Sequence, residues 1–215
     1  MNLSNVTVAS LYFVVVYGVA AADSFPSEDE NQVSMYSDRP LQLPQLDVDD
    51  GCPVSVGVTN VVSFEHQYVF GAGGYFFGTG PVYLALSWKP WNRAEAYFDL
   101  SQRTFTPDGY RLKTPWIMHP DYEGEALVRG ARIGADTKSE VRFAESTQSQ
   151  AITSNMVLRS DVTGTLVSDI QKSAVHAVWG FWPSHVILSE PGCYAVQIDT
   201  KDKSDIVVFE AKGTQ

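Results

Sequence analysis

Short stretches in which apolar and polar residues alternate recur along most of this chain. Residues 54–58 (VSVGV) have the period of two that is typical of a strand with one buried face. The strands predicted from such stretches are 54–58, 83–88, 94–100, 111–118, 127–133, 141–144, 175–179, 186–189, 193–199 and 206–211. Pro115 interrupts the fourth of these. No long stretch after residue 22 has the apolar period of a helix, so the pattern predicts an all-β protein.

Turn-forming residues separate these stretches. Glycine and proline cluster at 71–74, 78–81, 106–109 and 190–192, and residues 200–204 (TKDKS) suit a hairpin loop. Many short strands with frequent turns predict an antiparallel immunoglobulin-like β-sandwich. The polar residues 146–155 (STQSQAITSN) are expected to form a surface loop.

The N-terminus carries the one long apolar run. Residues 6–22 contain no charge and end in Ala20-Ala21-Ala22, which predicts that residues 1–22 are a secretory signal peptide. Residues 1–5 lack the lysine or arginine usual in such signals, so an uncleaved anchor and a buried helix remain alternatives. The run reaches only the lower limit of about 17 residues for a spanning helix. After cleavage, no membrane span is expected.

Charge is distributed unevenly. The formal net charge is −10, and residues 23–50 hold eight acidic residues against Arg39 alone, which accounts for −7 of it. This region is also rich in Ser, Pro, Asn and Gln, so it predicts an acidic flexible linker before a domain of residues 51–215. The domain is nearly neutral and shows no basic stripe, so no nucleic-acid partner is expected.

The chain has two cysteines, Cys52 and Cys193. Behind an export-type segment, a lone pair of cysteines predicts a disulfide bond and an extracellular or cell-surface location. Two free buried thiols are the alternative. A redox role is disfavoured because there is no Cys-x-x-Cys motif and no histidine beside either cysteine.

Several short motifs add a family resemblance. They are Gly51-Cys52-Pro53-Val54, Gly78-Thr79-Gly80-Pro81-Val82-Tyr83, Val128-Arg129-Gly130-Ala131-Arg132, Trp182-Pro183-Ser184, Pro191-Gly192-Cys193-Tyr194 and Ile206-Val207-Val208-Phe209. With these motifs the chain resembles a group of uncharacterised exported bacterial proteins. The resemblance implies export, a paired Gly-Cys framework and a small immunoglobulin-like sandwich, and it implies no chemistry. Residues 146–169 look like an insertion relative to that pattern, a place where specificity can reside.

Motifs that carry catalysis or bind metal are sparse. Gly-x-Ser-x-Gly and His-Glu-x-x-His are absent, and the four histidines are scattered. His119 beside Asp121 is the one candidate acid–base pair, and a surface loop is the favoured interpretation. The acidic hairpin of Asp199, Asp202 and Asp205 is interpreted as a solvated turn rather than a calcium site. We therefore expect no enzyme activity, no metal and no cofactor.

Aromatic residues are the remaining candidates for function. The candidate ligand-binding residues are Trp88, Trp91, Trp179 and Trp182, because exposed rings stack on sugars or anchor protein interfaces; the alternative is that they fill the core. Trp179 and Phe181 would share one face of a strand, with Trp182 on the other. The sequence thus favours a structural or protein-interaction domain. A carbohydrate- or envelope-binding module is the alternative, with a polysaccharide or an envelope protein as partner, and a hydrolase is a remote third possibility.

Overall fold

The computed structural model describes residues 35–46, 51–59, 61, 75–85, 94–103, 105–134, 139–145, 151–160 and 179–213. The strands are β1 (Val82–Leu84), β2 (Tyr97–Asp99), β3 (Phe105–Thr106), β4 (Gly109–Met118), β5 (Glu125–Ile133), β6 (Arg142–Glu145), β7 (Asn155–Arg159), β8 (Gly180–Leu188), β9 (Gly192–Asp199) and β10 (Ser204–Lys212). A short 3-10 helix, η1 (Leu100–Gln102), follows β2. Within the described part of the chain, no helix is long and apolar enough to cross a membrane.

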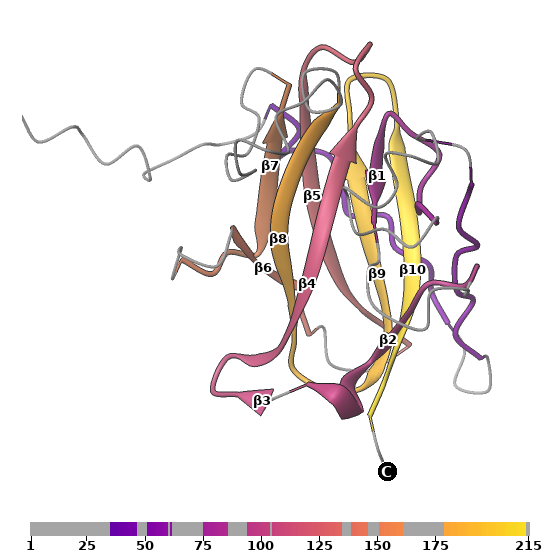
Figure 1. Cartoon of the computed structure of the whole chain (residues 1–215), viewed down its shortest axis with the longest axis vertical. Coiled ribbons are helices and arrows are strands. Elements are labelled where there is room, and N and C mark those ends of the chain that lie inside the picture. Colours follow the sequence, from indigo (N-terminus) through magenta and orange to yellow (C-terminus); the bar gives the residue numbers. More distant parts are fainter. Residues whose placement is uncertain are drawn as a thin grey trace, which may run out of the picture. The chain divides into compact units, whose positions relative to one another are not determined.

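The strands form two packed sheets, which confirms the predicted all-β sandwich. Sheet 1 has the order β1-β4-β8-β6, with β3 also paired to β4, and sheet 2 has the order β2-β10-β9-β5-β7. β4 and β8 of sheet 1 lie in front of β5, β9 and β10 of sheet 2 (Figure 1). The strand pairs are antiparallel except for β2 with β10, which run parallel.

The core between the sheets is rich in large aromatic side chains. Those buried there are Phe77, Phe98, Trp116, Phe143, Trp182, Tyr194 and Phe209. The ring of Phe209 contacts Phe98 edge-on at 5.1 Å and stacks on Tyr194 at 5.7 Å. These seven rings therefore serve packing, because burying rings of this size is a large apolar contribution to the stability of a small sandwich.

Isolated bridges join the two sheets at both sides. On one side Glu140 pairs with Ala131 of β5, and the chain then continues into β6 of the opposite sheet. On the other side the bridges are Val56–Glu95, Val58–Phe76 and Phe77–Leu84, which lead from β2 to β1. The predicted strand 54–58 thus exists only as two isolated pairings, and its role is to link the sheets.

The observed β7 and β8 differ from the sequence-based expectation, as do β1, which ends at Leu84, and β3, which was not expected. The polar loop was expected over residues 146–155 and no strand was expected directly after it, but Asn155–Arg159 form β7, which pairs with the first half of β5. β8 was expected only from residue 186, but it begins at Gly180 because Pro183 lies opposite Pro115 of β4. Two prolines can face each other at a pair that exchanges no hydrogen bonds, and Pro115 O instead accepts from Ala85 N. The two prolines therefore break no hydrogen bond between β4 and β8.

The predicted disulfide is present. Cys52 and Cys193 are bonded, with their Cα atoms 5.5 Å apart and a sequence separation of 141 residues. The bond ties residues 51–54 to β9 on the outer face of sheet 2, where both sulfurs pack beside Ile133, Ala195 and Val208.

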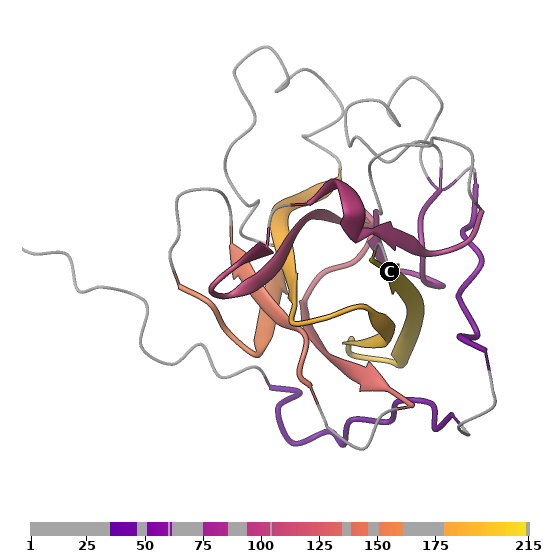
Figure 2. The same ribbon diagram turned by 90° about the horizontal axis from the view of Figure 1, so that it is seen from below.

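The region before the domain is only partly described. The predicted signal peptide of residues 1–22 lies outside the described residues and stays a prediction. Residues 35–46 differ from the expected flexible linker, because they lie along the outer face of sheet 2 (Figure 2). We call residues 35–46 the strap. A segment that buries Tyr36 and makes side-chain and backbone hydrogen bonds to the sheet is part of the domain, not a solvated spacer.

Candidate functional site

Of the four candidate tryptophans the structure describes two, Trp179 and Trp182, and these do not share a surface. Trp88 and Trp91 lie outside the described residues. Trp182 points into the core opposite Trp116 and is 8% exposed. Trp179, which precedes β8, is half-buried on the other face, where it packs with Phe181 and Ile117. As predicted, Trp179 and Phe181 lie on one face of sheet 1 and Trp182 lies on the other. Because they are on opposite faces, Trp179 and Trp182 cannot contact one ligand together.

Trp179 instead lies beside His119. Their ring centroids are 5.0 Å apart in an edge-on arrangement. The Nδ1 atom of His119 accepts a hydrogen bond from the backbone N–H of Asp121 at 3.2 Å, and the Asp121 carboxylate is 3.6 Å away. Both contacts join residues two apart in one exposed turn, so they hold that turn in shape.

A denser polar arrangement lies on the outer face of sheet 2, beneath the strap. Gln197 of β9 is completely buried there. Its Oε1 accepts from the backbone N–H of Gln42 at 2.7 Å, and its Nε2 donates to the carbonyl of Pro40 at 3.0 Å. One side-chain amide thus pairs with the N–H and C=O that flank Leu41, as the backbone of a neighbouring strand would.

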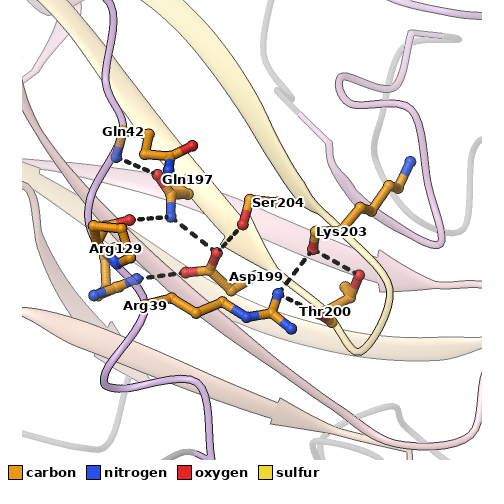
Figure 3. A network of polar contacts seen from close by, with 9 residues as sticks. Arg39, Gln42, Arg129, Gln197, Asp199, Thr200, Lys203 and Ser204 are labelled. Atoms are coloured by element: carbon orange, nitrogen blue, oxygen red, sulfur yellow. Dashed lines mark hydrogen bonds and ion pairs between the residues drawn. The ribbon is translucent and has the colours of Figure 1, made fainter.

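Asp199, two residues further along β9, sets the orientation of that amide. Its Oδ1 accepts from Nε2 of Gln197 at 2.9 Å and from Oγ of Ser204. Its Oδ2 pairs with Arg129 of β5 at 2.6 Å, and the Asp199 side chain is 0% exposed (Figure 3). A carboxylate can only accept, so Nε2 of Gln197 must face Asp199, and Oε1 is left to face Gln42. The solvated turn expected to contain Asp199 is therefore wrong for this residue.

Arg39 of the strap binds the loop between β9 and β10. Its Nη1 donates to the carbonyl of Thr200 at 2.6 Å and to that of Lys203 at 3.3 Å, and its Nη2 donates to the carbonyl of Lys201 at 3.1 Å (Figure 3). The guanidinium also lies 4.4 Å from the centroid of the Tyr36 ring. Several carbonyls converging on one planar cation make a site selective for arginine, since lysine offers no such fork.

Tyr36 and Met35 fasten the beginning of the strap. Tyr36 is 6% exposed, and burial together with its hydrogen bond to Tyr122 raises its pKa to about 12. The N–H of Met35 donates to Oε1 of Glu125 at 2.9 Å, and Oε2 of Glu125 pairs with Arg159 at 3.4 Å. The tyrosine hydroxyl therefore stays neutral and acts as a buried hydrogen-bonding group.

The end of the strap is held by apolar contacts. Leu43 and Leu46 pack on a buried group made by Ile133, Ala195 and Val208, next to the disulfide. From residue 35 to residue 46 the strap thus meets, in turn, a tyrosine pocket, an arginine site, the Gln197 amide and an apolar patch. This arrangement is suited to holding a polypeptide segment that begins in a turn. The described residues contain no group of three or more His, Cys, Asp or Glu placed to hold a metal ion.

Sequence reasoning missed this site because its polar residues occupy outward positions. Gln197 and Asp199 alternate with Val196 and Ile198, whose side chains enter the core. Outward polar residues on a strand normally meet solvent, so the alternation predicts a surface. One feature of the sequence did point to the site: Arg39 is the single basic residue in an acidic region. In the structure its guanidinium donates to the carbonyls of the loop between β9 and β10.

Comparison with known proteins adds little. No family model and no curated protein matches the chain. A solved structure of a protein from Bacillus anthracis described as a lipoprotein matches with a TM-score of 0.36 and 14% identity, over 64% of this chain and 77% of that one. A variant of the CFA/I adhesin CfaE of enterotoxigenic E. coli matches with a TM-score of 0.29 and 9% identity, over 60% of this chain and 48% of that one. Neither likeness carries an argument about activity or partners, so this chain is characterised by its own structure: a disulfide-bonded β-sandwich with a polypeptide segment laid on one sheet.

Proposed function

We propose that this chain is an exported, non-enzymatic domain that works through contacts with other polypeptides. The observation that carries the proposal is the strap, because one face of the sandwich already holds a polypeptide segment, a turn at 35–38 followed by irregular residues up to 46, through buried side chains. Pairing with backbone groups and filling pockets with alternate side chains is a common way for a sheet to bind a peptide. A domain built in this way acts by contact and needs no reacting group.

The disulfide supports the exported location. Both cysteines are only half-buried, and they are bonded. Such bonds persist in oxidising compartments and are rare where thiols are kept reduced. The domain would then act outside the cytoplasm or at the cell surface.

Site-specific photo-crosslinking tests the proposed function. A photoreactive amino acid would replace Leu41 on the strap, Val56 in the segment that links the two sheets, or Phe105 in β3. These residues are 43%, 69% and 58% exposed, respectively. These positions sample separate regions of the surface without disturbing the core. We expect protein adducts after irradiation of cells at one position and not at the others. Absence of adducts at all three, in a correctly folded protein, would count against a polypeptide partner.

A carbohydrate- or envelope-binding surface is the second candidate. It is supported by Trp179, whose half-buried ring lies on the outer face of sheet 1 beside His119. Saturable quenching of tryptophan fluorescence by a glycan, lost in Trp179→Ala and kept in Phe105→Ala, would favour this candidate over the first.

A further inference from the structure

We propose that the outer face of sheet 2 is a peptide-binding groove, filled by the strap within its own chain, and that the strap of a second copy can occupy it instead. The inference rests on the proposed function, because it names the partner of a domain that acts by polypeptide contact. It goes beyond that function by identifying the groove, the features of the ligand and the exchange between copies.

The groove is held in shape by the domain itself. The amide of Gln197 is oriented by Asp199, which is in turn fixed by Arg129 of β5 and Ser204 of β10. None of these residues belongs to the strap. The donor and acceptor that meet Pro40 and Gln42 therefore remain in place when the strap leaves, and a groove organised in advance binds its ligand at a lower entropic cost.

The groove is also selective. Its pocket beside Tyr122 takes Tyr36, and the carbonyls of Thr200, Lys201 and Lys203 take the guanidinium of Arg39. Leu43 and Leu46 fill the apolar patch beside the disulfide. A ligand must therefore present tyrosine, arginine and two leucines at the spacing found in the strap. The strap of a second copy meets every one of these requirements.

Exchange is possible because residues 47–50 are the part of the chain that connects the strap to the disulfide-bonded Cys52, so a cut there separates the strap covalently from the sandwich. Within one chain the strap competes at an effective concentration on the order of millimolar. A segment from another copy binds when it outcompetes that internal ligand, so removing the covalent link should raise the apparent affinity for a free strap.

Binding of a synthetic peptide tests this. A specific protease site would be placed in residues 47–50 of the full chain, and the folded, oxidised protein would be studied intact and after cleavage. The probe is a fluorescent peptide of residues 35–46, present in excess to replace the cleaved segment and followed by anisotropy. Two variant peptides probe the backbone contact: Gln42→Ala keeps the N–H that Gln197 binds, whereas Gln42→Pro removes it.

We expect saturable binding to the cleaved chain, at least about tenfold weaker binding to the intact chain, and similar binding of the native and Gln42→Ala peptides. The Gln42→Pro peptide should bind at least about tenfold more weakly, because Oε1 of Gln197 is left buried without a donor. Three outcomes would each contradict the proposed groove. They are no binding to the cleaved chain, equal binding to the intact and cleaved chains, and equal binding of the two variant peptides. Photo-crosslinks to other polypeptides would still stand in those cases, so the two proposals fail separately.

Discussion

At the scale of single residues, the key group is the carboxylate of Asp199. It is fully buried and satisfied by Arg129, Gln197 and Ser204, two of which come from other strands. A buried charge is tolerated only when its partners are all in place, and removing one partner leaves the rest uncompensated. This residue therefore joins β5, β9 and β10 to the strap.

We predict that Asp199→Ala lowers the free energy of unfolding by about 3 kcal/mol, since it leaves Arg129 without its partner in a largely buried setting. Urea unfolding followed by tryptophan fluorescence measures this loss. The matched control is Asp202→Ala in the exposed loop that follows, where the change should stay within about 0.5 kcal/mol. Equal unfolding midpoints for the two variants would contradict the assigned role of Asp199.

His185 gives the domain a dependence on pH. Burial lowers its pKa below 6.5, and the nearby positive charges of Arg111 and Lys113 lower it further. Its Nδ1 is buried without a hydrogen-bond partner among the described residues. Between the pKa of the folded state and 6.5, the unfolded chain binds the proton and the folded chain does not, so acidification through this window favours unfolding.

We therefore expect the urea midpoint to fall as the pH is lowered from about 8 to 5, with part of the fall absent in His185→Gln. The test is the difference between the two proteins at each pH, because other groups titrate equally in both. The proposed effect of His185 would be refuted by parallel pH profiles, or by a larger fall in the variant.

At the scale of strands, the close approach of neighbouring strands restricts which residue fits at a position, and the alternating β pattern does not show this restriction. Gly130 lies in β5 opposite Val196 of β9. A Cβ at this position would come within 2.5 Å of the carbonyl oxygen of Ala195 and 2.8 Å of Cγ1 of Val196. The first of these is backbone of the adjacent strand, which cannot move without disturbing the ladder. The glycine is thus required by the approach of β9.

Gly130→Ala should accordingly lower the unfolding free energy by about 2 kcal/mol through overpacking. Gly51→Ala is the control, because a Cβ there has nothing within 4 Å and the change should be within about 0.5 kcal/mol. Thermal and urea unfolding of both variants would show the difference, and a Gly130→Ala protein as stable as the control would mean that β5 and β9 are not packed this closely.

At the scale of the whole molecule, long-range connections hold the two sheets and the strap together. Isolated bridges link the sheets at both sides, and the disulfide joins residues 141 apart in sequence. In the chain-entropy model, closing so long a loop stabilises the folded state by at most about 5 kcal/mol. The same bond packs beside Leu43 and Leu46 of the strap.

The double variant Cys52→Ala, Cys193→Ala should therefore lose about 2–4 kcal/mol of unfolding free energy. A reducing agent should produce a similar loss in the native protein and no further loss in the variant. If reduction left the native midpoint unchanged, the bond would contribute nothing to stability and the long-loop argument would fail.

Much of the architecture follows from local sequence. Alternation predicted β2, β4, β5, β6, β9 and β10 close to their observed bounds, because the two faces of a strand differ in burial. Turn residues predicted the loop after β9 for the same kind of local reason. The cysteine pair behind an export-type segment predicted the disulfide, since redox chemistry depends on compartment more than on fold.

The candidate site was beyond what local sequence could predict. A polar residue on an outward position is solvated unless another segment covers it, and the segment that covers Gln197 lies 155 residues earlier. Likewise, Pro115 and Pro183 fit a sheet interior only because the register places them opposite each other. Local sequence accounts for the strands, for the positions of most of them and for the pairing of the two cysteines. Which polar groups are buried, and what they hold, depends on the tertiary fold, because burial depends on residues brought together from distant parts of the chain.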